Sequence, residues 1–546
     1  MVTAIAMAAP MSWRRLVYSV YSPALAGVFT RISDRIFRAR DRRGGSSVLL
    51  LAPLLAKAEP APESAAAAPG APHSLHAHFR WMAERVPAFR VNGARVHVLT
   101  SPDQFYQTLK ARVRTAKRRV VLASLYLGTG QLEQDLVDCM QEALENSQEN
   151  KHAPDLKVSV LLDYTRGSRG QVNSRTMLLP LLQRFASQMR VSLYHTPDLR
   201  GLLRMLVPQR FNETIGVQHI KVYLFDDSFI ISGANLSDSY FTNRQDRYVL
   251  LEDCGELADF FSELVEAVGD VSLQLGPDDS VAMQDGMVHP YQGDRQDFSA
   301  AASKHIMEVV DMARVRQQLL LSQHQHTEEE EEEQEEKDTW VFPLVQMKPL
   351  GIRVDEQVTQ RLLRDAGPDS TIYLTSGYFN LTRAYMHLVL GPGAGYRILT
   401  ASPEVNGFFG AKGVAGAIPD AYTHIARQFY ERVRQLGQQG RVQLHEYHRP
   451  QWTFHAKGLW YYLSEQDRPC LTLIGSPNFG YRSVHRDLEA QIAIVTENEQ
   501  LQDQLREEQE MLYRRSSEVS GLTFEQPDRH VKLWVKLVTP FIKNFF

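Results

Sequence analysis

Cysteine is scarce in this sequence, and its scarcity excludes two classes of site. The three cysteines, Cys139, Cys254 and Cys470, are too few and too widely separated for a disulfide framework. No CxxC pair or cysteine–histidine cluster occurs, so the ligands of a structural zinc site are missing as well. We therefore expect a protein of a reducing compartment that requires no metal ion and no other cofactor.

Long apolar runs and a strong net charge are also missing. The best candidate for a spanning segment, residues 48–56, is far shorter than the ~18 apolar residues that a membrane helix needs. A net charge of −4 over 546 residues argues against a nucleic-acid binder. Hydrophobic residues at 43% and charged residues at 23% are typical of a globular protein, and the length suggests at least two domains.

The N-terminal region differs in composition from the rest of the chain. Residues 1–33 contain three arginines and no acidic residue, and an Ala/Pro-rich stretch follows at residues 52–72. Arginine, serine and alanine with few acids are typical of a mitochondrial transit peptide. A secretory signal and a poorly ordered tail are the alternatives. We predict that residues 1–75 are a transit peptide followed by a disordered spacer.

A polar segment divides the remainder of the chain. Residues 301–339 include six consecutive glutamates, Glu328–Glu333. Such a run repels itself and cannot build a core. We therefore predict an acidic, solvated linker at 301–339 between a first half at residues 76–300 and a second half at residues 340–546.

The two halves match one another element by element. The runs Val120–Leu127 and Ile372–Phe379 are both typical of buried strands, and a helical pattern follows each of them. Short apolar runs that alternate with helical patterns favour an α/β fold with a mostly parallel sheet. A repeat of this length indicates a duplicated domain rather than a solenoid.

Each half carries the same polar motif. A histidine and a lysine stand two residues apart on a predicted strand, so their side chains share one face. An asparagine follows each pair, and an acidic residue follows each asparagine by eleven positions. The two sets are His219, Lys221, Asn235 and Asp246 in the first half, and His455, Lys457, Asn478 and Glu489 in the second.

This paired constellation resembles the phospholipase D superfamily. From about Arg90 to the C-terminus the chain is most similar to the mitochondrial phosphatidylglycerophosphate synthase family. That resemblance implies a duplicated α/β domain with two mixed or mostly parallel sheets flanked by helices, and an active site at the pseudo-twofold interface. The stretches that carry it are residues 123–130, 218–226, 401–412 and 453–457.

The residue types suit phosphodiester chemistry. A phosphodiester is anionic, so its attack requires positive charge and a nucleophile that is neutral near pH 7, which imidazole provides. One of His219 and His455 would attack phosphorus, and the other would protonate the leaving CMP and then deprotonate the incoming alcohol. The lysines and asparagines would stabilise the phosphoryl oxygens. The resemblance implies that Asp246 and Glu489 orient the imidazoles.

The two copies differ seven residues after the histidine. The first copy has Asp226 there, and the second has Tyr462. The resemblance places this aspartate in the catalytic motif, mainly as a structural ion-pair partner. Because the first copy is intact, we predict that His219 is the nucleophile.

Two further groups of residues are candidates for phosphate or nucleotide contacts. The resemblance implies a nucleotide-binding stretch at residues 123–130, for the cytidine nucleotide of the substrate or for ATP, although the spacing is not that of a P-loop. The alternative is that residues 123–130 are only the end of the first strand and bind no nucleotide. Arg166, Arg169 and Arg175 would bind the phosphate of the acceptor or the pyrophosphate of the donor, or belong to a solvated loop. The nucleotide-binding residues are Ala123, Ser124, Leu125, Tyr126, Leu127, Gly128, Thr129 and Gly130.

The C-terminal residues 529–546 combine basic and aromatic side chains and contain no acid. This composition suits an interfacial membrane segment, and a last element packed on the core is the alternative. Residues 199–210 also mix arginine with apolar bulk. We expect an ordinary amphipathic helix there, with a contact to acyl chains or anionic lipid as the alternative. The predicted C-terminal anchor comprises Lys532, Trp534, Lys536, Phe541, Lys543, Phe545 and Phe546.

Three classes of function follow. The leading hypothesis is a phosphatidyltransferase that uses CDP-diacylglycerol and glycerol 3-phosphate, upstream of cardiolipin, on the matrix side of the mitochondrial inner membrane. A phospholipase D-type hydrolase or nuclease and a non-catalytic lipid-binding scaffold are the alternatives. The two intact motif sets disfavour the scaffold, and the balanced charge disfavours the nuclease.

Overall fold

The computed structural model describes residues 75–149, 155–322, 337–464 and 466–545. These residues fall into two units. The larger unit contains both predicted halves and the chain end at residues 543–545, and the smaller unit contributes residues 532–542. The predicted transit peptide and the glutamate run lie outside the described residues.

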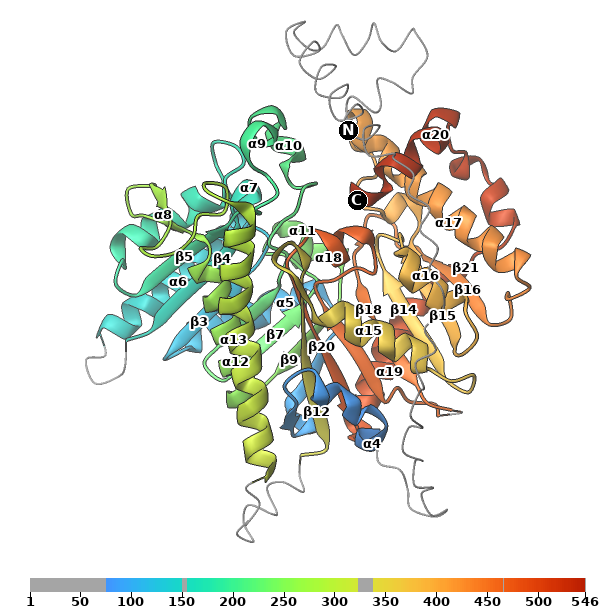
Figure 1. Ribbon diagram of the computed structural model, residues 1–546, viewed down its shortest axis with the longest axis horizontal. Helices are drawn as coiled ribbons and strands as arrows, with labels where there is room; N and C mark the ends of the chain where they lie inside the picture. The colour runs from blue at the N-terminus through green and yellow to red at the C-terminus, as the bar shows by residue number, and fades with distance from the viewer. Residues whose placement is uncertain (1–74, 150–154, 323–336, 465, 546) are drawn as a thin grey trace, which may run out of the picture. The chain divides into compact units, whose positions relative to one another are not determined.

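A nine-stranded sheet forms the centre of the first half (Figure 1). Its middle strands are aliphatic and almost completely buried, as expected for strands covered on both faces. In order across the sheet the strands are β11 (Val281–Ala282), β10 (Leu273–Leu275), β5 (Met189–Tyr194), β4 (Lys157–Asp163), β3 (Arg119–Ala123), β6 (Val222–Phe225), β7 (Ser228–Ser232), β9 (Tyr248–Leu251) and β2 (Val96–Leu99).

A ten-stranded sheet forms the centre of the second half. One of its strands, β13 (Ile352–Arg353), pairs with β12 off the main path. The others are, in order, β1 (Phe89–Val91), β12 (Thr339–Met347), β20 (Glu489–Thr496), β19 (Leu471–Gly475), β18 (Lys457–Tyr462), β14 (Thr371–Ser376), β15 (Gly395–Ala401), β16 (Val442–Tyr447) and β21 (Ser516–Glu518).

The two sheets share one strand order. The path β10-β5-β4-β3-β6-β7-β9-β2 corresponds strand for strand to β21-β16-β15-β14-β18-β19-β20-β12, which is the arrangement expected of a duplicated domain. Within these two sheets, parallel pairing is confined to β3-β4-β5 and β14-β15-β16. The sheets are therefore mixed, but not mostly parallel. Short links such as the two-residue turn Asp226–Asp227 between β6 and β7 can join only antiparallel neighbours.

Helices flank both sheets, and several begin at residues suited to the helix N-terminus. Ser101 accepts a hydrogen bond from the Gln104 amide at the start of α5, and Pro102 fills its first turn. The helices of the first half are α5 (Pro102–Thr115), α6 (Gln131–Glu149), α7 (Tyr164–Gly167), α8 (Ser174–Arg184), α9 (Gly201–Leu206), α10 (Gln209–Asn212), α11 (Asp238–Thr242), α12 (Gly255–Asp270) and α13 (Arg295–Ser322); those of the second are α15 (Val354–Asp365), α16 (Arg383–Leu390), α17 (Ile418–Gln435), α18 (Tyr481–His485) and α19 (Glu499–Tyr513).

Two segments lie elsewhere than the sequence suggested. Strand β1 and helix α4 (Leu75–Phe79) were expected in the first half, but β1 pairs with β12 and Phe79 packs in the core of the second half. Residues 301–322 were expected to be solvated linker, but they belong to α13, which packs against α12. Its apolar residues recur every four positions within a polar sequence, and Phe298, Ile306 and Val310 are buried.

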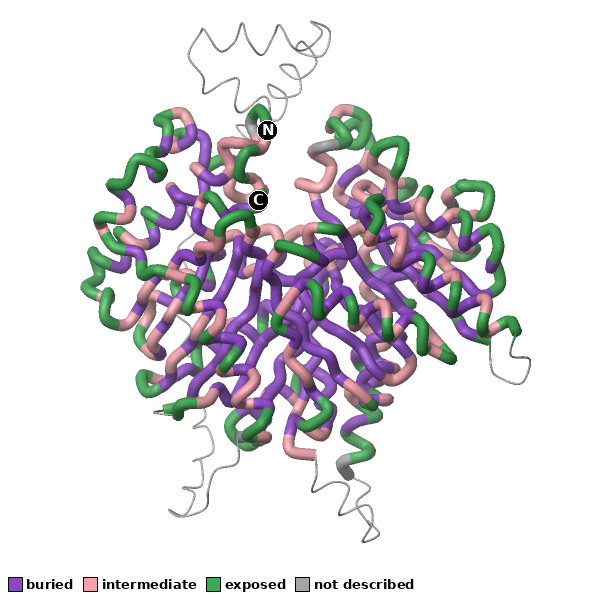
Figure 2. The backbone as a smooth tube through the Cα atoms, turned by 180° about the vertical axis from the view of Figure 1, so that it is seen from behind, coloured by how far each residue is buried: buried purple, intermediate pink, exposed green. Residues whose placement is uncertain are grey.

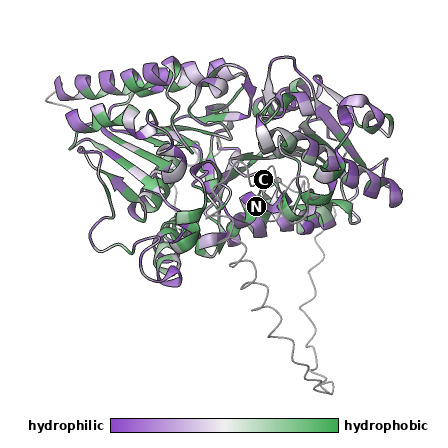
Figure 3. Cartoon of the chain, turned by 90° about the horizontal axis from the view of Figure 1, so that it is seen from above, coloured by the Kyte–Doolittle hydropathy of each residue, from purple (hydrophilic) through white to green (hydrophobic). Residues whose placement is uncertain are grey.

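The two halves share a continuous hydrophobic core in addition to a core of their own. The shared core combines Val121 and Phe261 of the first half with Val341, Trp460 and Leu505 of the second. Figure 2 shows the strands buried and the exposed residues concentrated on the outer helices. Hydrophobic residues follow the strands, whereas the flanking helices alternate between hydrophilic and hydrophobic turns (Figure 3).

The described part of the smaller unit is dominated by one helix, α20 (Leu533–Ile542). Leu533, Leu537 and Phe541 recur every four residues along it and are 72%, 55% and 68% exposed. They form an apolar stripe on the surface of this helix. Among the described residues, no helix combines the length and hydropathy required to cross a bilayer.

Candidate active site

Matching hairpins position the two motif copies. Lys221 immediately precedes β6, and Lys457 is the first residue of β18. The next strand of each hairpin, β7 or β19, leads into the loop that carries Asn235 or Asn478. The two copies of the sequence motif therefore lie in the same local structure, a β-hairpin followed by a loop.

Each histidine binds the acidic residue of the opposite half. The Nδ1 atom of His219 lies 2.9 Å from Oε2 of Glu489. The Nδ1 atom of His455 lies 2.6 Å from Oδ2 of Asp246. A carboxylate at this distance holds the proton on Nδ1 and leaves Nε2 as the basic, nucleophilic atom. Neither half on its own contains a complete histidine–acid pair.

Backbone pairing between the halves explains this exchange. The His455 amide donates to the Gln245 carbonyl at 2.8 Å, where β17 (Thr453–Phe454) runs parallel to β8 (Arg244–Gln245). The His219 amide likewise donates to the Leu488 carbonyl at 2.8 Å. Asp246 and Glu489 are the next residues after these carbonyls. The register of two short parallel pairings thus brings each acid to the other half's imidazole.

The two lysines lie inside the same cluster and are almost completely buried. Nζ of Lys221 donates to the carbonyl of His219 at 2.7 Å, and Nζ of Lys457 lies 3.0 Å from Nδ1 of His455. Burial lowers the pKa of Lys457 to about 8, and burial lowers the pKa of Lys221 well below its ordinary value. A Cβ at Gly233 would lie 2.7 Å from Asp246 and 3.0 Å from Lys457, so this glycine allows the close approach.

Burial also shifts the pKa values of the imidazoles and carboxyls. It lowers the pKa of His219 and of His455 well below 6.5, with the neighbouring lysines adding to the effect. It raises the pKa of Asp246 to about 6 and raises the pKa of Glu489 as well. The imidazoles are therefore neutral at pH 7, as a nucleophile requires.

The surroundings of the two histidines differ at Nε2. The hydroxyl of Tyr240 lies 3.3 Å from Nε2 of His455 and accepts a hydrogen bond from Asn235 at 3.1 Å. Within the part of the chain that the structure describes, no residue hydrogen-bonds Nε2 of His219. The position that corresponds to Tyr240 in the second half is Ser483, whose hydroxyl accepts instead from the backbone N–H of Asn478.

The two predicted asparagines tie their loops to the first strand of each half. Oδ1 of Asn235 accepts from the Leu125 amide at 3.4 Å, and Oδ1 of Asn478 accepts from the Ser376 hydroxyl at 3.0 Å. The NH2 group of Asn235 also donates to the Tyr240 hydroxyl, so its second N–H and the NH2 group of Asn478 are the donors that remain. That geometry is compatible with the predicted hydrogen bond to a phosphoryl oxygen.

Asp226 lies away from this cluster, which corrects its place in the catalytic set. It occupies the turn between β6 and β7, at the opposite end of β6 from Lys221, with a φ of 53°. Its carboxylate accepts hydrogen bonds from three consecutive amides, those of residues 117, 118 and 119, at 2.8 to 3.1 Å. Its role is to hold the turn to the start of β3.

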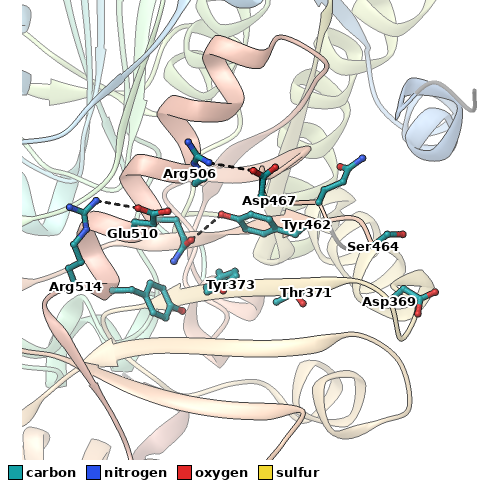
Figure 4. A pocket seen from close by; sticks show the side chains of 12 residues that line it. Asp369, Thr371, Tyr373, Tyr462, Ser464, Asp467, Arg506, Glu510 and Arg514 are labelled. Carbon is teal, nitrogen blue, oxygen red and sulfur yellow. Dashed lines mark hydrogen bonds and ion pairs between the residues drawn. The ribbon is translucent and has the colours of Figure 1, made fainter.

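Tyr462 occupies the corresponding position of the second half and has a different structural role. Its hydroxyl donates to Gln509 at 3.0 Å, and its ring packs on Tyr373 with centroids 5.2 Å apart. It lines a pocket of about 800 Å³ together with Arg506 and Glu510 (Figure 4). This pocket lies at the end of β18 remote from Lys457, so the motif difference does not reach the catalytic cluster.

The predicted nucleotide-binding stretch, residues 123–130, follows β3 and borders the site. Its amides are largely engaged within the protein: Leu125 donates to Asn235, and Gly128 donates to a neighbouring carbonyl at 2.8 Å. The Glu133 carboxylate lies against Gly128, where a Cβ would be 2.1 Å from it. The stretch therefore supports the Asn235 loop, and its contact with a nucleotide stays a prediction.

The three predicted phosphate-binding arginines separate into two groups. Arg175 pairs with Asp279 at 2.6 Å and is held outside the catalytic cluster. Arg166 and Arg169 both pair with Glu213, six residues before His219. These two arginines are thus held beside the segment that leads to His219, whereas Arg175 has a structural role.

Several residues of the site were not found from the sequence. Besides Tyr240, they include Ser476, whose hydroxyl donates to Glu489, and the fully buried Arg247 next to Asp246. Arg247 donates to Glu508 and to the Leu473 carbonyl, which ties the two halves together behind the cluster. A serine precedes the asparagine in both halves, as Ser–x–x–Asn in the first and as Ser476–x–Asn478 in the second. This repetition is the one sequence signal that points to Ser476.

The described residues contain no group of three or more His, Cys, Asp and Glu side chains arranged to hold a metal ion. The chemistry of the cluster is that of two imidazoles, two carboxylates and two lysines. It provides a nucleophile, a proton carrier and positive charge for one phosphorus atom.

Comparisons with known proteins agree with the site. The chain is 62% identical over 556 residues to the human "CDP-diacylglycerol–glycerol-3-phosphate 3-phosphatidyltransferase, mitochondrial", covering 100% of each protein. It is 39% identical to a probable enzyme of that activity from Dictyostelium discoideum, over 86% of the chain and 80% of the relative. The corresponding enzyme of Saccharomyces pastorianus is 33% identical, over 83% and 88%. No protein-family model matches.

Among solved structures, the phosphatidylserine synthase of Haemophilus influenzae superposes with a TM-score of 0.62 at 19% identity, over 86% of the chain and 99% of that protein. This likeness concerns the fold. Fold and site together show the paired His–Lys arrangement by which the sequence resembles the phospholipase D superfamily. The chain belongs to the family of CDP-diacylglycerol–glycerol-3-phosphate 3-phosphatidyltransferases.

Proposed function

We propose that the protein transfers the phosphatidyl group of CDP-diacylglycerol to glycerol 3-phosphate, releases CMP and forms phosphatidylglycerophosphate, the precursor of phosphatidylglycerol and cardiolipin. The observation that carries this proposal is the reciprocal histidine–acid pairing, His219 with Glu489 and His455 with Asp246. It occurs in a chain that is 62% identical along its whole length to the human enzyme of that name.

In the first step, Nε2 of His219 attacks the phosphorus atom of the phosphatidyl group. A P–N bond forms, the bond to the bridging oxygen breaks, and His455 donates a proton as CMP leaves. The anionic donor raises the pKa of His455 when it binds, because a nearby negative charge favours the imidazolium. Lys221 and Lys457 stabilise the negative charge that grows on the phosphoryl oxygens.

In the second step, His455 removes the proton from a hydroxyl of glycerol 3-phosphate. The resulting oxygen attacks phosphorus, the P–N bond breaks, and His219 is regenerated as a neutral imidazole. Arg166 and Arg169 bind the phosphate of the acceptor from the edge of the site. The cytidine nucleotide of the donor contacts residues 123–130 through the Tyr126 side chain, over which Arg166 stacks at 4.0 Å. The reaction requires no further cofactor.

The enzyme acts as a peripheral protein on the matrix side of the mitochondrial inner membrane. The name of the human relative supports a mitochondrial location. Helix α20 supplies a membrane contact through its exposed stripe of Leu533, Leu537 and Phe541, flanked by Lys532. Phe545 contributes less than the sequence suggested, because its ring packs 4.3 Å from the Arg486 guanidinium.

The test is to incubate the purified protein with CDP-diacylglycerol, with and without glycerol 3-phosphate. A new lipid phosphate that forms only when the alcohol is present supports the transferase. Phosphatidic acid produced at the same rate in both reactions would instead establish the alternative, a hydrolase of the same superfamily. The His219→Asn variant serves as the inactive control for either outcome.

A further inference from the structure

Helix α9 exposes apolar side chains that contribute nothing to the core. Four of its six residues are leucine or methionine, yet none of the six is buried. Leu202, Leu203 and Met205 are 66%, 43% and 81% exposed. A helix this short is unstable in water unless an apolar face packs against something. The expected helix is present, but its apolar side chains are not packed on the core.

The charges around α9 are positive, and their partners are neutral: Arg200 donates to the Gly293 carbonyl, and Arg204 lies 3.9 Å from the centroid of the Tyr291 ring. Residues 199–212 contain three arginines and no acidic residue. In the described ranges, neither Arg200 nor Arg204 forms an ion pair with a carboxylate. The acids on either side of the segment are already neutralised, Asp198 by Arg295 and Glu213 by Arg169. The surface of α9 thus combines an apolar centre with an excess of positive charge.

The position of α9 connects it to the catalytic cluster. It follows β5, on the same edge of the sheet as the loops that carry the motif residues (Figure 1). The segment that contains α9 lies between β5 and β6 and has no counterpart in the second half. There only residues 448–452 separate β16 from β17, the strand that leads to His455. In the α9 segment, the Thr214 carbonyl accepts a hydrogen bond from Arg486 at 3.0 Å, three residues before Glu489, and the chain then leads directly to His219.

We propose that α9 is a lipid-docking surface that binds an anionic phospholipid bilayer and so holds the His219 side of the site at the membrane from which the donor lipid comes. Leucine and methionine enter the boundary between headgroups and acyl chains, and the arginines bind anionic headgroups. The proposal rests on the proposed function for the identity of the lipid. Each cation contributes about fivefold to the affinity for an anionic leaflet.

The experiment measures flotation of the full chain on vesicles of phosphatidylcholine with and without phosphatidylglycerol. The test variant is Leu202→Asp/Met205→Asp, and the matched control is Met312→Asp/Leu319→Asp. The control residues are 63% and 53% exposed on the C-terminal half of α13, which extends to the side of the first half opposite α9 (Figure 1). Circular dichroism and thermal unfolding establish that both variants fold, and Leu202→Ser/Met205→Ser is a milder second variant.

We expect the α9 variant to lose at least about tenfold in vesicle affinity, and the α13 control to bind as the wild type does. Arg200→Gln/Arg204→Gln should remove most of the preference for vesicles that contain phosphatidylglycerol. Equal binding by wild type and the folded α9 variant, or an equal loss in the control, overturns the proposal. So does a wild-type protein that binds no vesicles, a result that would assign the surface to a protein partner.

Activity separates this proposal from the proposed function. With CDP-diacylglycerol in detergent micelles the α9 variant should transfer at the wild-type rate, and on vesicles it should be slower. An equal loss in micelles and on vesicles would mean that α9 acts on the catalytic cluster rather than on the membrane. A wild-type protein inactive in both systems would refute the transferase, and the flotation result would still decide whether α9 docks on lipid.

Discussion

The two copies of the motif occupy equivalent strands but have different surroundings. His455 is enclosed: Asp246 binds one ring nitrogen, and the hydroxyl of Tyr240 lies beside the other. His219 shares only the first of these contacts, and its side chain is 13% exposed, against 6% for His455. Two matching hairpins thus supply two imidazoles, and two contacts of His455 make them unequal: the Tyr240 hydroxyl and Nζ of Lys457, which lies 3.2 Å from its Nε2. The open imidazole suits attack, and the enclosed one suits proton transfer.

Replacement of the histidines gives the largest expected effect and tests this division directly. His219→Asn should lower transfer by more than about 10⁴-fold and leave no lipid on the protein, because the nucleophile is gone. His455→Asn should lower transfer by about 10²–10⁴-fold and accumulate phosphatidyl-protein, because the second step lacks its base. Radiolabelled donor and acid-lability of the protein-bound label distinguish the two. Label retained on His219→Asn instead would reverse the roles.

The reciprocal pairing is tested by combining substitutions. Asp246→Asn should lower kcat/KM by about 10²-fold, because His455 loses the carboxylate that orients it. In the His455→Asn background, Asp246→Asn should lower kcat/KM hardly any further, because the imidazole that Asp246 orients is already absent. A full additional loss in the His455→Asn background would mean that Asp246 acts on its own half.

The pH dependence of kcat/KM should show two limbs that belong to the His455 side. Burial lowers the pKa of Lys457 to about 8, so the lysine loses its charge and activity falls as the pH rises through that value. Burial raises the pKa of Asp246 to about 6, so the carboxylate is protonated and activity falls as the pH drops through that value. Lys457→Arg should move the alkaline limb upward, because a guanidinium stays charged. An alkaline limb unchanged in that variant would contradict the assignment.

The smallest effects are expected at the position where the two motifs differ. Asp226→Asn should lower the free energy of unfolding by about 1–3 kcal/mol, because three backbone amides lose a charged acceptor. Tyr462→Phe removes one hydrogen bond to Gln509 and should cost about 0.5–1.5 kcal/mol. Neither change should alter kcat by more than about twofold, since both side chains lie remote from the cluster. Denaturant unfolding and initial rates on the same samples provide the check.

Much of the architecture was predictable because it depends on local pattern. The apolar run that begins at Val120 is continuous, as expected for a strand covered on both faces, and the His–x–Lys spacing places two side chains on one face; a sequence displays both patterns directly. The strand itself ends at Ala123, before the end of the predicted run. The exchange of acids between halves was not predictable, because it is set by the register of β8 against β17, a contact between residues about 200 positions apart. Helix α13 was missed because its buried positions are diluted by polar residues. The sequence motif groups Asp226 with the catalytic residues, but it does not show that strand β6 separates Asp226 from Lys221.

The reciprocal site also has a consequence for the history of the chain. A single half has a histidine without its acid, so it would have been inactive until two copies met, and a symmetric pair would have formed two identical histidine–acid contacts. Any mutation in such an ancestor would appear in both copies at once. In a single chain that constraint is absent, and Tyr240, Tyr462 and the α9 segment each occur in one half only. The covalent link is in this sense what allows the two imidazoles to have unequal surroundings.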